Sequence, residues 1–202
     1  MSRIRMATAL GLTLMVLAGG YLRLARLEQA TMGGDVMEFY KICQSGVRPA
    51  ELLVHSPKYI GAMPPLWFAA HNWFLQAFQL PVDFGTVRRL DAITGILTIL
   101  AAFGAGRAAG GRWIGLLTAF LVTLQPLHVQ MSRESYFYVP IVLGCFIGLW
   151  ALLRLSARLD QGKSPDAGFY LLVLPAFLLL THIQISSWSF AAVWIVALYA
   201  LL

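Results

Sequence analysis

The chain has 202 residues, of which 59% are hydrophobic and 12% are charged. Several apolar runs approach the ~20 residues that a helix needs to cross a bilayer, so the composition indicates an integral membrane protein and excludes an ordinary soluble domain. The net charge is +6, but the basic residues stand in ones and twos at the ends of apolar runs. This distribution is typical of membrane orientation and of contact with anionic headgroups, and it argues against nucleic acid binding.

The N-terminus has a basic start and then an apolar stretch, a pattern that signal peptides and retained membrane helices share. The stretch is long, and "AGGYLRLARLEQ" offers a poor small-residue cleavage site. We therefore expect a retained helix with a cytoplasmic N-terminus. Cys43 lies in a polar loop and Cys145 in an apolar run, so the two cysteines indicate neither a disulfide framework nor a zinc site.

The apolar runs predict an all-α polytopic transmembrane bundle, with residues 1–202 as a single membrane domain. The expected spanning helices are 6–27, 88–108, 113–129, 136–155, 169–184 and one that begins near residue 187. The Gly-rich "GAGRAAGG" predicts a tight turn between two of them, because it lacks the preceding strand and the following Lys-Ser/Thr of a phosphate loop. Residues 28–87 are predicted to form a non-cytoplasmic loop with juxtamembrane helices.

The segment 64–82, "PPLWFAAHNWFLQAFQLPV", decides the predicted topology. A spanning helix here would carry four polar side chains into the hydrocarbon, each of which would need a protein partner. At helical spacing these residues fall on roughly one side, opposite an aromatic and leucine face, so the pattern favours a helix that lies in the interface. The positive-inside rule supports this choice. The four residues are His71, Asn72, Gln76 and Gln79.

This topology places several polar groups at one non-cytoplasmic surface. A carboxylate there can take the proton of an acceptor hydroxyl or amine, and an Arg or Lys can hold a phosphate. The cluster therefore predicts group transfer involving a membrane-anchored phosphate. Its candidate residues are Asp35 and Glu38 in "GGDVMEFYKICQSG", His55 and Lys58 in "HSPKYIGAMPP", Arg133 and Glu134 in "MSRES", and His182 at the end of "LLLTHIQISS" if its helix runs outward.

Four motifs occur in order over residues 89–155: an Arg-Leu at the start of a helix, a Gly-Arg hinge, a helix ending in Pro-Leu-His, and Ser-Arg-Glu followed by a Tyr. Upstream and downstream stand "GGDVMEFY", "MPPLWF" and "LLLTHIQ". Together they resemble the C-type membrane glycosyltransferases, specifically the relatives of the protein mannosyltransferases and of the lipid A aminoarabinose transferase.

The resemblance implies an enzyme of the bacterial inner membrane that takes a sugar from a polyprenyl-phosphate carrier and transfers it to a lipid, glycan or protein on the periplasmic face. By position, Asp35 matches the general base, and Arg133 with Glu134 matches the pair near the carrier phosphate. In some members a divalent metal lies near the acidic residues. Many relatives have Asp-Glu together, whereas here Glu38 follows Asp35 by three positions, which still shares a helix face.

Each of these residues also has a structural interpretation. Arg133 and Glu134 are also typical of an ion pair that anchors a helix end, and Asp35 after two glycines is equally typical of an N-cap. His182 is also typical of a polar helix end, and His55 with Lys58 of an exposed loop.

Other functions stay open at this stage. Members of the resembled family usually run longer, so we expect these residues to be the N-terminal part of such an enzyme or a shortened relative. A shortened relative could be a non-catalytic transmembrane subunit that binds membrane lipids and partner subunits. A small-solute transporter is less favoured, because the sequence shows no clear inverted repeat and its polar residues gather at one surface.

Overall fold

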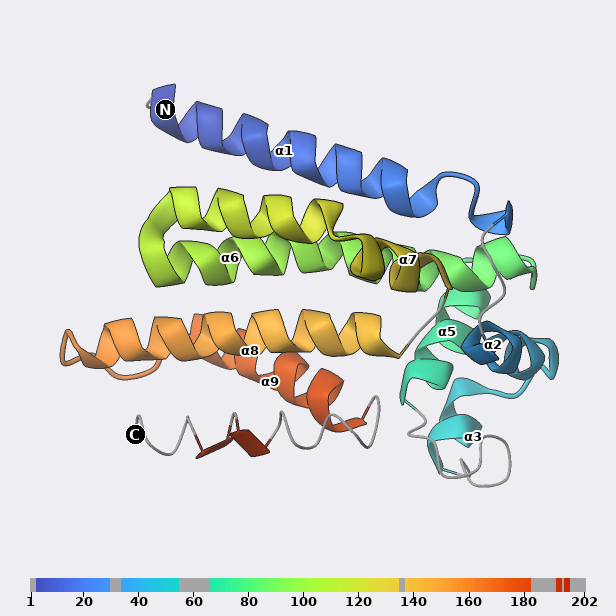
Figure 1. Cartoon of the computed structure of the whole chain (residues 1–202). Helices are drawn as coiled ribbons and strands as arrows, with labels where there is room; N and C mark the ends of the chain where they lie inside the picture. Colours follow the sequence, from blue (N-terminus) through green and yellow to red (C-terminus); the bar gives the residue numbers. More distant parts are fainter. Residues whose placement is uncertain are drawn as a thin grey trace.

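The structure is a computed structural model that describes residues 3–29, 34–54, 66–134, 137–182, 192–193 and 195–196. Over these residues every regular element is a helix and none is a strand, which confirms the predicted all-α class. The long helices α1 (Arg3–Leu24), α6 (Phe84–Leu124), α8 (Tyr138–Leu159) and α9 (Ala167–His182) form a bundle, and short helices cover one of its ends (Figure 1).

Helix α6 is a helical hairpin. Its 41 residues are interrupted at Gly110 and at Gly111 (φ 84°), where the chain folds back so that residues 84–109 and 112–124 form two antiparallel arms (Figure 1). Glycine adopts this positive φ without a steric penalty. The arms pack closely, because a Cβ on Gly115 would lie 2.8 Å from the backbone oxygen of Phe103. The turn predicted from "GAGRAAGG" is confirmed.

Among the described residues, three helices are long and apolar enough to cross a membrane: α1, α6 and α8. Helix α9 is apolar but shorter, with 16 residues and Pro175 inside it. These helices support a membrane protein. The predicted helix that begins near residue 187 falls mostly outside the described residues.

The predicted spanning helix 113–129 is wrong at its C-terminal end, because the chain breaks at Gln125 and a separate helix, α7 (Pro126–Glu134), follows. A proline disfavours helical geometry in the residue before it, and Gln125 is extended (ψ 113°). The predicted start of the preceding helix at residue 88 is also late. Asp83 caps α6 by accepting a hydrogen bond from Thr86 N at 2.7 Å.

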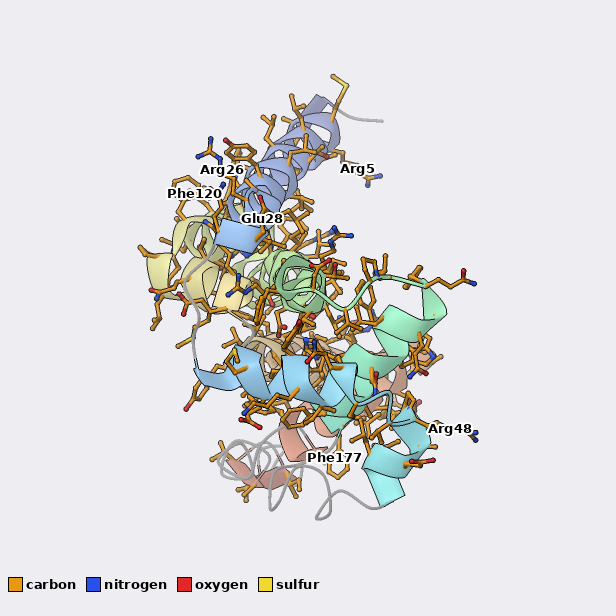
Figure 2. All side chains as sticks on the ribbon, turned by 90° about the vertical axis from the view of Figure 1, so that its right-hand side faces the viewer. Arg5, Arg26, Glu28, Arg48, Phe120 and Phe177 are labelled. Atoms are coloured by element: carbon orange, nitrogen blue, oxygen red, sulfur yellow. The ribbon has the colours of Figure 1, made fainter. Side chains whose placement is uncertain are left out.

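In the part of the chain that the structure describes, four short helices cover one end of the bundle: η1 (Leu27–Gln29), α2 (Gly34–Gln44), α3 (Pro49–Val54) and α5 (Leu66–Ala77). We call this the capped end. Helix α2 packs against α5 and α6, and α3 packs against α5. Figure 2 looks onto this end and shows Arg48, before α3, pointing away from the bundle.

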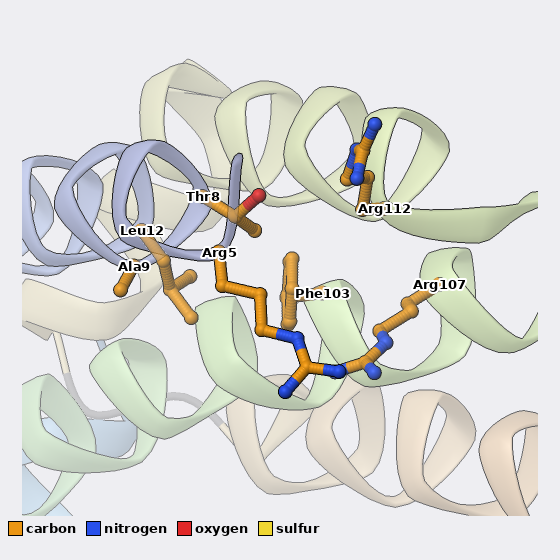
Figure 3. Close-up of a pocket in the computed structure, with 7 residues that line it drawn as sticks. All are labelled: Arg5, Thr8, Ala9, Leu12, Phe103, Arg107 and Arg112. Carbon is orange, nitrogen blue, oxygen red and sulfur yellow. The ribbon is translucent and has the colours of Figure 1, made fainter. Parts of the chain in front are cut away.

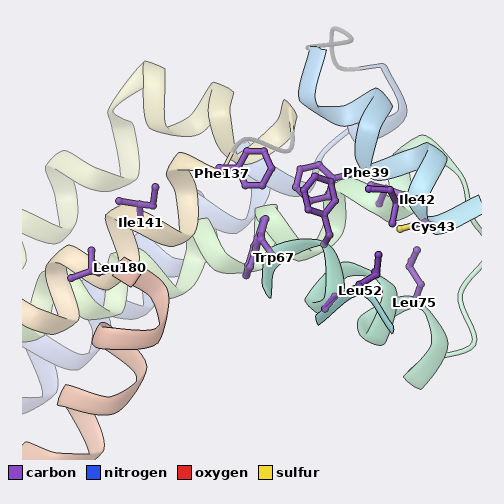
Figure 4. Packing of buried hydrophobic residues seen from close by; sticks show 12 residues of the cluster. Phe39, Ile42, Cys43, Leu52, Trp67, Leu75, Phe137, Ile141 and Leu180 are labelled. Atoms are coloured by element: carbon purple, nitrogen blue, oxygen red, sulfur yellow. The ribbon is translucent and has the colours of Figure 1, made fainter. Parts of the chain in front are cut away.

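An aromatic cluster attaches the short helices to the bundle. Phe39 of α2 is fully buried, and its ring stacks on Phe68 of α5 at 4.5 Å and lies 5.1 Å from Phe137 at the start of α8. Burying a phenylalanine contributes roughly 1.5–3 kcal/mol. Leu180 of α9 also joins the cluster (Figure 4). The helices α2 and α5, which lie between α1 and α6 in the chain, therefore contribute to the protein core.

The interfacial orientation predicted for the segment 64–82 is wrong in one respect. A helix does form there, but His71 and Asn72, expected on a polar side opposite the aromatic face, are buried together with Trp67. Trp73 and Phe78 are exposed instead, with 61% and 62% of their surface accessible. His71 and Asn72 turn inward because each finds a buried partner, Asp91 of α6 and the carbonyl oxygen of Val47, whereas Gln76 and Gln79 stay exposed.

Helix α1 crosses α6 at small residues. A Cβ on Gly95 of α6 would lie 2.8 Å from both Arg23 Nε and Ser132 Cβ, so glycine is required for this close approach. Arg23, at the end of α1, is fully buried. Its guanidinium donates to the carbonyl oxygens of Gly19 and of Val122 at 3.2 and 3.0 Å. This contact joins α1 to the end of the second arm of α6.

Candidate functional site

The structure brings the predicted acidic helix and the predicted arginine corner to the same end of the bundle. Asp35 and Glu38 belong to α2, and Arg133 and Glu134 belong to α7, both at the capped end (Figure 1). The backbone of Asp35 lies in the first turn of α2, which begins one residue earlier, and its side chain lies outside the described residues. A negative charge in a first helical turn is favourable.

Glu38 is exposed and already has a partner. Its carboxylate accepts a hydrogen bond from Lys41 Nζ at 3.0 Å, and half of its side chain is accessible. Both residues lie on α2, three positions apart. Exposed pairs of this kind contribute little to stability, so Glu38 remains available to an incoming group.

The guanidinium of Arg133 is bonded to the backbone through one of its three nitrogens. Its Nη2 donates to the carbonyl oxygens of Ala25 and Arg26, at 3.0 and 3.5 Å, just after the end of α1. Its Nε is buried and has no hydrogen-bond partner among the described residues. An unbonded buried donor is costly. The part of Arg133 that an anionic oxygen can reach is the outer end of the guanidinium, where the side chain lines a groove and pairs with no carboxylate among the described residues.

Glu134 is buried, with 6% of its surface accessible, and its carboxylate accepts from Gln130 Nε2 at 3.0 Å. It also interacts electrostatically with Arg88 of α6. Consecutive helical residues do not face one another, and the described contacts of Arg133 and Glu134 go to different partners. The interpretation as an anchor pair bonded to itself therefore finds no support in these contacts.

Arg133 and Glu134 line an open groove of 530 Å³ between the end of α1 and α7. Apolar side chains from both helices form part of its wall, and Gln29 and Gln130 add polar groups. The apolar lining residues are Leu22, Leu124, Pro126 and Val129. We call this the Arg133 groove. A phosphate on a long hydrocarbon chain has the chemistry that this lining would accommodate.

The structure says less about three other predicted site residues. His55 and Lys58 lie outside the described residues. The backbone of His182 ends α9, and its side chain lies outside the described residues. Leu180, one turn earlier, packs in the cluster with Phe137, so the end of α9 lies near the capped end, as predicted for an outward-running helix.

A buried polar network lies behind the site. Asp91 of α6 is fully buried; its Oδ1 accepts from Trp67 Nε1 at 3.0 Å and its Oδ2 lies 2.7 Å from His71 Nε2. The other ring nitrogen, Nδ1, lies 2.9 Å from the carbonyl oxygen of Trp67. Both ring nitrogens of His71 therefore face oxygen atoms, and a hydrogen bond joins the imidazole to the carboxyl group of Asp91. The network fixes α5 against α6.

A second buried polar layer lies under α7, outside the candidate spans. Burial, and then the positive charge of Arg23, lowers the pKa of His128 to about 4. The imidazole is therefore neutral near pH 7. Ser132 Oγ donates to the His128 carbonyl oxygen at 2.6 Å and packs against Gly95. This layer sets the height of α7, and with it the position of Arg133, relative to the bundle.

The sequence interpretation missed Asp91, His71 and Arg23 as buried polar groups. The sequence feature that could have indicated them is Asp91 at the start of an apolar run, because a carboxylate within a membrane helix needs a polar partner in the protein. No group of three or more metal-ligating side chains occurs among the described residues, and the metal suggested by the resemblance has no ligand set there.

In comparisons with known proteins, no family model, no curated sequence and no solved structure matched this chain.

Proposed function

We propose that this chain is the membrane part of a glycosyltransferase that uses a polyprenyl-phosphate sugar donor, with the carrier phosphate in the Arg133 groove. The observation that supports this most is that Arg133 lines a groove with an apolar wall and pairs with no carboxylate among the described residues. An arginine presents donors in a fixed fork that suits phosphate oxygens, and charge-assisted hydrogen bonds are the stronger ones.

The proposed reaction needs one base and one phosphate site. A carboxylate of α2, Asp35 first and Glu38 second, takes the proton of the acceptor hydroxyl or amine. The acceptor atom then bonds to the anomeric carbon, and the bond from that carbon to the carrier phosphate breaks. The phosphate leaves with both electrons of that bond and gains negative charge, which Arg133 stabilises. The gathering of α2 and α7 at one end of the bundle supports this division of roles.

The first test is carrier binding by the purified full chain in nanodiscs, with a fluorescent polyprenyl monophosphate as the probe. We expect Arg133→Ala to weaken binding about tenfold or more, because a hydrogen bond to a charged group contributes about 1.5–3 kcal/mol. Arg133→Lys should retain part of the affinity. The matched control is Arg48→Ala, which removes an exposed arginine at the same end that points away from the bundle. Equal binding by wild type and Arg133→Ala would contradict the proposal.

The second test separates binding from chemistry. Asp35→Asn keeps the shape of the side chain and removes its basicity, so we expect carrier binding to persist while release of free carrier from a polyprenyl-phosphate sugar stops. Normal release by this variant would remove Asp35 from the role of base and would move that role to Glu38.

The competing function is a non-catalytic transmembrane subunit. This function is favoured by the exposure of α1. Only 11% of the most apolar stretch of α1 is buried in the structure, against 56% for the corresponding stretch of α6. This exposed face fits lipid tails and equally fits a partner helix. Fixed-stoichiometry partner chains in the purified material, together with no carrier binding at Arg133, would favour that function over the transferase.

A further inference from the structure

An open pocket of 890 Å³ lies at the end of the bundle opposite the capped end, between the N-terminal half of α1 and the turn of α6 (Figure 3). We call it the basic pocket. Arginines from both helices line it: Arg5 comes from α1, Arg107 from the first arm of α6, and Arg112 from just after the turn. Leu12 and Phe103 contribute apolar surface.

The shape of the basic pocket follows from the packing of α1. Near Gly19, α1 lies close to α6, since a Cβ at that position would lie 3.6 Å from Thr123 and closer still to Ile99. Toward its N-terminus α1 diverges from the hairpin (Figure 1). The turn at Gly110 and Gly111 places an arginine on each arm beside the opening.

The charges of the basic pocket are unbalanced. Within the described part of the chain, no carboxylate pairs with Arg5, Arg107 or Arg112. The side chains of Arg5 and Arg107 nevertheless point toward one another (Figure 3), an arrangement that like charges disfavour unless an anion lies between them. Arg112 lies 5.6 Å from the ring of Trp113, which leaves its charge uncompensated.

Two neighbouring arginines provide an internal contrast. Arg154 and Arg158 lie at the same end of the bundle, and both donate to Asp166 Oδ2, at 2.7 and 2.9 Å. Here the chain itself provides an anionic partner, because one carboxylate bonds to both arginines. The arginines of the basic pocket have no such partner among the described residues. A second pocket of 420 Å³, lined by Phe103, Arg107 and Trp150, adjoins the basic pocket and continues its apolar surface.

We propose that the basic pocket binds the headgroup of an anionic glycerophospholipid. Its phosphate lies between Arg5 and Arg107, and an acyl chain follows Leu12 and Phe103 along the groove. Basic pockets between membrane helices take anionic headgroups in this way, and guanidinium groups suit phosphate oxygens. A zwitterionic lipid would leave the three positive charges uncompensated. This site is separate from the Arg133 groove and does not depend on the proposed transferase activity.

The test is native mass spectrometry of the purified full chain in detergent, titrated in separate arms with phosphatidylglycerol, phosphatidylcholine and inorganic phosphate. We expect phosphatidylglycerol to bind more tightly than phosphatidylcholine. Arg107→Gln should lower its affinity about fivefold, and Arg5→Gln with Arg107→Gln about 25-fold, from about 1 kcal/mol per arginine. Arg89→Gln is the matched control, because it removes an exposed arginine of α6 at the capped end.

A second variant keeps all charges and tests the shape of the pocket. Ala9 lines the basic pocket and is exposed, so Ala9→Trp should fill it and lower phosphatidylglycerol binding at least fivefold, while melting temperature stays near that of wild type. Three outcomes would overturn the proposal: equal binding of the two lipids, displacement of lipid by equimolar inorganic phosphate, or wild-type affinity in the double arginine variant. The second outcome would indicate an anion site with no lipid specificity.

Discussion

The two ends of the bundle use charged side chains in opposite ways. At the capped end Asp91 and His71 are buried, bonded to one another and enclosed by Trp67 and Phe39. At the basic end, the charged groups are exposed or half-buried, and three arginines of the pocket have no carboxylate partner among the described residues. Buried, fully bonded charges determine which helices meet, whereas exposed, unbalanced charges remain available to a ligand.

This difference predicts where substitutions affect the fold. A buried pair that loses one member leaves an uncompensated polar group in a low-dielectric surrounding. When an exposed ion pair loses one member, water bonds to the remaining group, and the free energy of unfolding changes little. We therefore expect large effects on stability at the capped end and small ones at the basic end.

The largest expected effect is that of Asp91→Ala. It removes the partner of both His71 Nε2 and Trp67 Nε1, and breaking a buried pair costs about 3–5 kcal/mol. The measurement is the free energy of unfolding in mixed micelles. Asp91→Asn, which keeps a side-chain oxygen for Trp67, should lose less. A loss below about 1 kcal/mol for Asp91→Ala would contradict the buried network and the comparison between the ends.

The pH dependence of stability should come mainly from His128. Its pKa is about 4 in the folded protein and 6.5 when exposed, so the unfolded chain binds more protons between these values and stability falls as pH falls from 6.5 toward 4. The full loss is roughly 3 kcal/mol. Chemical unfolding at pH 7 and pH 4 measures it. His128→Gln should flatten this response, and an unchanged slope in that variant would contradict the buried position of the imidazole.

The smallest expected effect is at Asp166, between α8 and α9. The hydrogen bond from Arg154 is the main cause that lowers the pKa of this half-buried carboxyl, and Arg158 adds to it. The stability that the ionised Asp166 contributes is present above its ordinary pKa of 3.8 and is lost as pH falls through its lower pKa in the folded protein. Asp166→Asn should change the melting temperature little, and less at high salt. A loss as large as that of Asp91→Ala would remove the contrast between the ends.

Features that depend on local sequence were predictable. The apolar runs indicated the long helices, and the glycines of "GAGRAAGG" indicated the turn at Gly111, because both signals involve only neighbouring residues. The predicted helix 113–129 missed the break before Pro126, although the residue pair itself carries that signal. For the candidate site, the prediction that α2 and α7 share one end agrees with the structure.

Features that depend on tertiary partners were not predictable. The face that α5 buries is set by Asp91, which lies 20 positions from His71 in the sequence, and no periodicity within α5 contains that information. The bonding of Arg133 to the carbonyl oxygen of Ala25 spans 108 positions. The basic pocket also needs three arginines from α1 and from both arms of α6, so it emerges only from the packing of the hairpin against α1.

The glycine turn of α6 has a consequence for assembly. Its two arms contact one another across a short stretch of chain, as between Gly106 and Ile114, so closing this loop costs little conformational entropy. Two apolar helices joined in this way bond their backbone groups internally and are suited to enter a bilayer together. Helices α1 and α8 both pack on α6, so a hairpin that enters the bilayer as one unit presents the surface on which the helices before and after it in the chain dock.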